Sequence, residues 1–150
     1  MLPAWRPNTT SDYPFHNVAL TVNGKAVKSL IHAFPNVQAW DYTKITKKAL
    51  QWAAGLLPDN YHITFSKSES NDSDVAKVLK AGGNVAVVFE KALPDTYLSK
   101  RVINGDESDA RFLDSKGFLD SKGVVVGLKA KGLGKADSSG FVVRQLESVA

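Results

Sequence analysis

The sequence of 150 residues contains no cysteine. The chain therefore has no disulfide framework, no thiolate nucleophile and no iron–sulfur cluster held by its own residues. With 43% hydrophobic and 23% charged residues, it is long enough to bury a core without disulfides or a structural metal. We expect a single domain over residues 1–150 that needs no cofactor.

The sequence also lacks an apolar run near the length of a membrane span, and it lacks the charged and then apolar segments of a secretory signal. These absences predict a cytoplasmic location and no membrane partner. The formal net charge of +4, with a pI near 9.3, favours anionic partners such as nucleic acid.

The sequence contains no phosphate-binding loop and no serine in a nucleophile elbow. Residues 62–64, His-Ile-Thr, have the form of one half of a two-histidine phosphoesterase site, whose chemistry needs two such halves. His16 and His32 are not followed by the required threonine or serine, which disfavours that interpretation.

An acidic cluster at Asp106, Glu107 and Asp109 offers oxygen ligands to a hard divalent cation. The spacing of these residues matches no calcium loop. A solvated acidic turn is therefore the favoured interpretation, and we expect no metal site.

The centre of the chain reads as a strand, a helix and a second strand. Residues 61–65 alternate aromatic or branched side chains with polar ones, which predicts a strand. After a polar run, Val75, Val78 and Leu79 form one apolar stripe, which predicts a helix. Residues 85–89 are all apolar, which is typical of a strand covered on both faces in a parallel sheet.

The other segments extend this plan. Asn23-Gly24 between two apolar runs predicts a small β-hairpin insertion over residues 18–27, because both residues tolerate the positive φ of a type I′ turn. A helix should follow Thr43, with Lys44, Lys47 and Lys48 toward solvent. Further short elements are predicted at residues 2–6, 30–34, 37–42, 101–105, 124–128 and 141–143, and residues 93–97 look like an irregular turn.

Together these segments predict an α/β fold with a mostly parallel sheet built from βα units. The sheet is either open or a partial βα barrel, with the hairpin inserted near the N-terminus. A basic tail rich in glycine and lysine follows over residues 129–150.

Residues 112–117 and 118–123 both read FLDSKG. A tandem copy of this length is too short for a solenoid period, and it indicates a duplication, natural or engineered, that lengthens a loop. We expect the second copy to bulge into solvent.

Several short stretches carry a resemblance to a known family. They lie at residues 10–12, 34–38, 41–44, 61–69, 71–72, 84–89, 102–109 and 124–132. Across residues 6–143 the chain resembles the carboxy-terminal part of an uncharacterised phage and plasmid protein family related to gene product eighty-eight. The resemblance implies a phage- or plasmid-type protein and brings no established activity with it.

Members of that family carry a cysteine-bearing segment ahead of this region, suggestive of a metal or cluster site. Because this chain has no cysteine, the resemblance implies that such chemistry is lost here or comes from another chain. The FLDSKG copy is a second departure from the family pattern, at the loop around Asp114.

The carboxyl ends of the predicted parallel strands should form the binding edge, because loops and helix N-termini gather there. Polar residues near these ends are candidate ligand-binding residues: Asn8, Asp12, Tyr42, Lys44, Ser66, Ser68, Glu90, Lys129 and Lys131. Glu69 and Asp41 are candidate general bases. Glu69 equally suits a structural role at the first turn of the following helix.

Three functions remain open. The first is a phage- or plasmid-type α/β domain that binds an anionic ligand, a nucleotide or nucleic acid, at the carboxyl edge of its strands. The second is a small metabolic enzyme that uses Glu69 or Asp41 as a general base. The third is a fragment of a larger barrel that forms a homo-oligomer through an open sheet edge. The sequence does not decide whether the protein is an enzyme.

Overall fold

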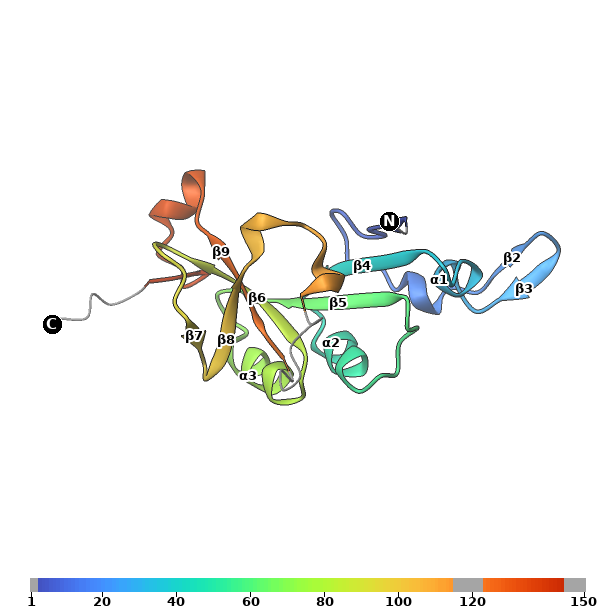
Figure 1. Cartoon of the computed structure of the whole chain (residues 1–150), viewed down its shortest axis with the longest axis horizontal. Helices are drawn as coiled ribbons and strands as arrows, with labels where there is room; N and C mark the ends of the chain where they lie inside the picture. The colour runs from blue at the N-terminus through green and yellow to red at the C-terminus, as the bar shows by residue number, and fades with distance from the viewer. Residues whose placement is uncertain (1–2, 115–122, 145–150) are drawn as a thin grey trace, which may run out of the picture.

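The computed structural model describes residues 3–114 and 123–144. One mainly parallel sheet runs through them (Figure 1). Its strands, in spatial order, are β1 (Ala4–Trp5), β4 (Gln38–Thr43), β5 (Tyr61–Ser66), β6 (Asn84–Phe89), β9 (Val125–Lys129), β8 (Lys100–Asn104) and β7 (Thr96–Tyr97). Every neighbouring pair in this order is parallel except β7 with β8, which confirms the predicted α/β fold.

The sheet ends at β1 on one side and at β7 on the other, and these two strands do not pair with each other in the described part of the chain. The sheet is therefore open there. A short tenth strand, β10 (Val142–Val143), pairs in parallel with Val88 and Phe89 of β6. Since β5 pairs with residues 84–86 of β6 and β9 takes the opposite edge, β10 continues the line of β5 beyond its end.

Two helices cover one face of the sheet, α2 (Thr46–Ala53) and α3 (Asp72–Lys80) (Figure 1). The predicted apolar stripe of α3, Val75, Val78 and Leu79, is at most 2% exposed and packs in one core with Phe65 of β5 and Val85 of β6. Burial of these branched and aromatic side chains is the main force that holds the helices on the sheet.

After β8 the chain forms an arch, residues 105–114, over the opposite face of the sheet. It contains two 3-10 turns, η2 (Gly105–Glu107) and η3 (Arg111–Leu113), and η3 contacts β4 and β5 (Figure 1). The guanidinium of Arg111, which is 1% exposed, donates hydrogen bonds to the carbonyls of Gly105 and Ser108. The arch is thus closed by its own buried arginine, and its turn η3 lies against β4 and β5.

The predicted hairpin is confirmed. Strands β2 (Leu20–Val22) and β3 (Lys25–Val27) pair in a separate antiparallel sheet at one end of the molecule (Figure 1). Asn23 and Gly24 have φ values of 49° and 77°, as a type I′ turn requires. A turn η1 (Phe15–Asn17) precedes the hairpin, and helix α1 (Leu30–Ala33) follows it, capped by the Ser29 hydroxyl, which accepts from the His32 amide.

Two sequence-based expectations were wrong. Lys48 does not face solvent, because its ammonium group forms an ion pair with Asp12 and the side chain is only 4% exposed. Residues 93–97 are not wholly irregular, because Thr96 and Tyr97 form β7. The turn that joins β7 to β8 uses Leu98 and Ser99 at positive φ, so it lacks the glycine or asparagine that would have signalled it.

Two other expectations concern residues 115–122 and 145–150, which lie outside the described part of the chain. They are the loop made by most of the FLDSKG repeat and the end of the basic tail. The described part of the tail contains a 3-10 turn, η4 (Gly132–Ala136), and β10. Within the described residues, no helix has the length and apolar character needed to cross a membrane.

Gly105 lies at the start of the arch, where η2 packs against β9. We expect Gly105→Ala to lower the free energy of unfolding by about 1–3 kcal/mol. An added Cβ would stand 2.5 Å from Cγ1 of Val126 and 2.6 Å from Nη1 of Arg111, both in the interior. Chemical denaturation measures the change. Gly134→Ala is the matched control, because an added Cβ there meets no heavy atom closer than 3.9 Å; equal stability of the two variants would contradict the packing argument.

Candidate functional site

A cavity of about 440 Å³ opens at the carboxyl ends of β1, β4 and β5, and we call it the Arg6 cavity. Its walls come from the loop after β1, from the end of β4 and from the last residue of β5. Nine residues line it: Arg6, Thr9, Thr10, Ser11, Asp12, Tyr42, Thr43, Lys44 and Ser66. The parallel direction of the three strands brings these distant segments to one edge.

Arg6 is held by two aromatic rings of β4. Its guanidinium carbon lies 5.2 Å from the ring centre of Trp40 and 5.0 Å from that of Tyr42. Its Nε is buried without a hydrogen-bond partner, and the described residues provide Arg6 with no carboxylate partner. The guanidinium is therefore positioned by stacking, while its donors remain available to a ligand.

Hydroxyl groups and a second cation surround Arg6 in this cavity. Thr9, Thr10, Ser11 and Ser66 supply hydroxyls that can donate to a ligand oxygen. Burial raises the pKa of Tyr42, so its phenol stays protonated. Lys44 is exposed, and its ammonium group forms no ion pair within the described part of the chain. The cavity thus offers two positive charges and several neutral donors.

Asp12 is the acidic residue of the cavity, and three donors already occupy its carboxylate. Oδ2 accepts from the Thr43 hydroxyl at 2.6 Å and from the Lys44 amide at 2.9 Å. Oδ1 lies 3.3 Å from the ammonium nitrogen of Lys48. These contacts fasten the loop after β1 to the start of α2, and they leave the positive charges of Arg6 and Lys44 uncompensated.

Asn8 and Asp41 lie beneath this loop in the interior. The fully buried Asp41 carboxylate accepts from the Asn8 amide at 2.8 Å, from Asn8 Nδ2 at 3.0 Å and from the Tyr61 hydroxyl at 2.6 Å. Burial and the hydrogen bond to Asp41 raise the pKa of Tyr61, which keeps its phenol as a donor. Asp41 does not line the Arg6 cavity; its contacts anchor the loop that does.

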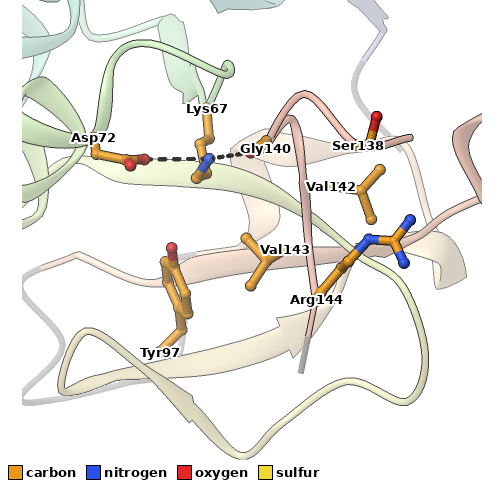
Figure 2. A pocket seen from close by; sticks show the side chains of 8 residues that line it. All are labelled: Lys67, Asp72, Tyr97, Ser138, Gly140, Val142, Val143 and Arg144. Carbon is orange, nitrogen blue, oxygen red and sulfur yellow. Dashed lines mark hydrogen bonds and ion pairs between the residues drawn. The ribbon is translucent and has the colours of Figure 1, made fainter. Parts of the chain in front are cut away.

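A second cavity, of about 310 Å³, lies beyond β5 and β10, and we call it the Lys67 cavity. Figure 2 shows the Lys67 ammonium group between Asp72 and the Gly140 carbonyl. The distances are 3.2 Å to Asp72 and 2.9 Å to Gly140, and a third contact of 3.1 Å reaches the Ser68 carbonyl. All three ammonium hydrogens therefore have partners, and Lys67 ties the C-terminal segment to the end of β5.

The other predicted residues lie outside the Arg6 cavity. Ser68 is buried and donates its amide to Asn71 Oδ1, whereas Glu69 is exposed in the loop before α3. Glu90 forms an ion pair of 3.3 Å with Arg144 at the Lys67 cavity. The Lys129 amide and the Lys131 ammonium group both contact Asp106, at 2.9 Å and 3.3 Å.

A protein-family model described as Gene product 88 matches residues 1–145. The chain belongs to this family. The match confirms the resemblance seen in the sequence, although it does not point specifically to the carboxy-terminal part of the family. Comparisons with curated proteins and with solved structures gave no significant match.

In this member of the Gene product 88 family, the structure brings four of the predicted residues together in one cavity: Asp12, Tyr42, Lys44 and Ser66. Sequence reasoning missed Arg6, which it placed inside a short edge strand. In the structure β1 ends at Trp5, so Arg6 lies just past the strand, at the same edge as the other candidates, and the sequence carried no signal for this earlier end. Among the described residues, no group of three or more histidine or acidic side chains is placed to hold a metal ion.

Proposed function

We propose that this protein binds an anionic ligand, a nucleotide or a nucleic acid, in the Arg6 cavity. The observation that carries the proposal is the Arg6 guanidinium, which is stacked on Trp40 and Tyr42 and has no carboxylate partner among the described residues. A positioned arginine of this kind forms short, charge-assisted hydrogen bonds with phosphate or carboxylate oxygens.

The size and lining of the cavity support a ligand larger than a single ion. A volume of about 440 Å³ falls in the range of small-molecule sites. Lys44 adds a second cation at the rim, and the threonine and serine hydroxyls of the loop after β1 add neutral donors. These groups suit a phosphate group next to Arg6 with the remainder of the ligand along the loop.

The enzyme hypothesis has less support. Asp41 uses its carboxylate to hold Asn8 and Tyr61, and Glu69 is exposed outside the Arg6 cavity. Self-association through a sheet edge also stays a prediction. The two edge strands, β1 and β7, are two residues long each, so each presents few unpaired backbone groups to a second chain.

Arg6→Met should weaken the binding of a mononucleotide by about 10-fold or more, since a hydrogen bond to a charged group contributes about 1.5–3 kcal/mol. Methionine keeps an unbranched apolar stem against the two rings and removes only the charged fork. Isothermal titration calorimetry at low salt measures the affinity. Arg6→Lys should lose an intermediate amount, because lysine keeps the charge without the planar fork.

Lys28→Met is the matched control, because Lys28 is exposed and lies outside the Arg6 cavity. The salt dependence of oligonucleotide binding separates the two ligand classes, since a longer phosphate backbone gives a steeper loss of affinity with salt. The proposal fails if neither a mononucleotide nor an oligonucleotide binds at low salt, or if Arg6→Met binds as the unmodified protein does.

A further inference from the structure

We propose a second anion site, for a small inorganic oxyanion such as phosphate, in a separate cavity of about 160 Å³ that we call the Lys48 cavity. It lies on the other side of Asp12, between the turn η1 and the start of α2. The residues that carry the argument are Lys48, His16, Lys47, Gln51 and Asp12, and all five line this cavity.

Lys48 is a buried cation with unused donors. Its side chain is 4% exposed, and its ammonium nitrogen lies 3.3 Å from Asp12 Oδ1 and 5.4 Å from the centre of the Tyr61 ring. An ammonium group has three hydrogens to donate, and this one has a single hydrogen-bond acceptor among the described residues. Asp12 and the Tyr61 ring stabilise the buried charge. The remaining hydrogens of the ammonium group can donate to a further acceptor in the cavity.

His16 brings a second unsatisfied group to the same place. It is 7% exposed, and its Nδ1 is buried with no hydrogen-bond partner. Its ring packs on Tyr61 at 5.7 Å between centres, so the imidazole is fixed beside Lys48. Burial, and then the charge of Lys48, lower the pKa of His16, so the ring is neutral at pH 7 and can offer an N–H to an oxygen.

The size and charge of the cavity select a small anion. A volume of about 160 Å³ is much smaller than that of the Arg6 cavity and suits a tetrahedral oxyanion rather than a nucleotide. Lys47 adds a second positive charge at the opening, and Gln51 adds an amide. Because Asp12 is already shared with Lys48 and Thr43, the lining has an excess of positive charge that disfavours a metal cation.

The two anion sites share Asp12 but do not depend on each other. Oδ1 of Asp12 contacts Lys48, whereas Oδ2 accepts from Thr43 and from the Lys44 amide beside the Arg6 cavity. Arg6 does not line the Lys48 cavity, and neither Lys48 nor His16 lines the Arg6 cavity. Variants on either side of Asp12 can therefore separate the two sites.

The test is a titration of the full chain with inorganic phosphate, followed through the imidazole resonances of His16 by NMR. We expect a saturable shift of the His16 signals, no comparable shift for His62, which does not line the Lys48 cavity, and no effect of chloride at equal ionic strength. Arg6→Met should keep the His16 shift, whereas Lys48→Met should weaken the phosphate affinity by about 10-fold or more. If Lys48→Met does not fold, Lys47→Met at the exposed opening should weaken it severalfold.

The inference is overturned if His16 shows no saturable shift in the millimolar range of phosphate, if chloride produces the same shift, or if Lys48→Met and Lys47→Met leave the affinity unchanged. Loss of the shift in Arg6→Met would also overturn it, because the signal would then report the Arg6 cavity. A retained His16 shift in a protein that binds no nucleotide would support the second site while contradicting the proposed function.

Discussion

Asp41→Ala should lower the free energy of unfolding by about 3–5 kcal/mol, because the substitution leaves three buried donors without their acceptor. Those donors are the amide and the side-chain Nδ2 of Asn8 and the hydroxyl of Tyr61. Since Asn8 lies within the loop that lines the Arg6 cavity, the loop should also lose its anchor. Urea or guanidinium unfolding measures the change in stability.

Two variants sharpen this experiment. Tyr61→Phe removes one of the three donors and leaves the carboxylate in place, so it should destabilise by only about 1 kcal/mol. Asp59→Ala removes an exposed carboxylate and should change the stability by less than about 0.5 kcal/mol. If Asp41→Ala proved as stable as Asp59→Ala, the anchoring role would be wrong and the hypothesis of Asp41 as a general base would regain support.

Acidification should destabilise the protein through His62. Burial, and to a smaller extent the charge of Arg111, lower the pKa of His62 to about 3, against 6.5 for the free side chain. The folded state therefore binds fewer protons than the unfolded state between these values. The stability that His62 contributes is present above pH 6.5 and is lost as the pH falls toward 3; at about pH 5 the loss should be about 2 kcal/mol.

The structure gives the physical reason for this sensitivity. His62 is 6% exposed, its Nε2 lies 3.1 Å from the Thr64 hydroxyl, and its ring packs on Trp52 at 4.6 Å between centres. No described carboxylate forms an ion pair with this ring to stabilise the imidazolium form. A proton on His62 would therefore be a buried charge next to Arg111, without a counter-ion.

Denaturation curves at about pH 7.5 and about pH 5 test this prediction. The difference in unfolding free energy between the two pH values should shrink by about 2 kcal/mol in His62→Gln and should stay unchanged in His32→Gln, whose side chain is exposed. His16, whose pKa is also lowered by burial, should cause a smaller loss of stability on acidification. An undiminished pH dependence in His62→Gln would show that other groups cause the acid sensitivity.

Several parts of the fold were predictable because their signals are local. Alternation over residues 61–65 and the stripe of Val75, Val78 and Leu79 gave β5 and α3. The Asn-Gly pair predicted the β2–β3 hairpin, because only a few residues adopt positive φ easily. The turn at Leu98 and Ser99 could not be predicted, because neither residue favours the positive φ that it adopts there.

The candidate site was predictable only in outline. Parallel strands place their carboxyl ends together, so Asp12, Tyr42, Lys44 and Ser66 could be expected to meet. The burial of Lys48 could not be expected, because its partner Asp12 lies 36 positions earlier in the chain. Nor could the sequence distinguish Asp41, which holds the loop from within, from residues that face the cavity.

The sequence by itself determined the type of each main element, the mostly parallel sheet and the edge at which polar residues gather, because side-chain periodicity and turn chemistry act over a few neighbouring residues. Only the tertiary structure decided that Arg6 stacks on Trp40 and Tyr42 without a carboxylate partner, and that Lys48 and His16 share a second cavity. These contacts depend on strand order and register, which bring together residues that are far apart in the chain.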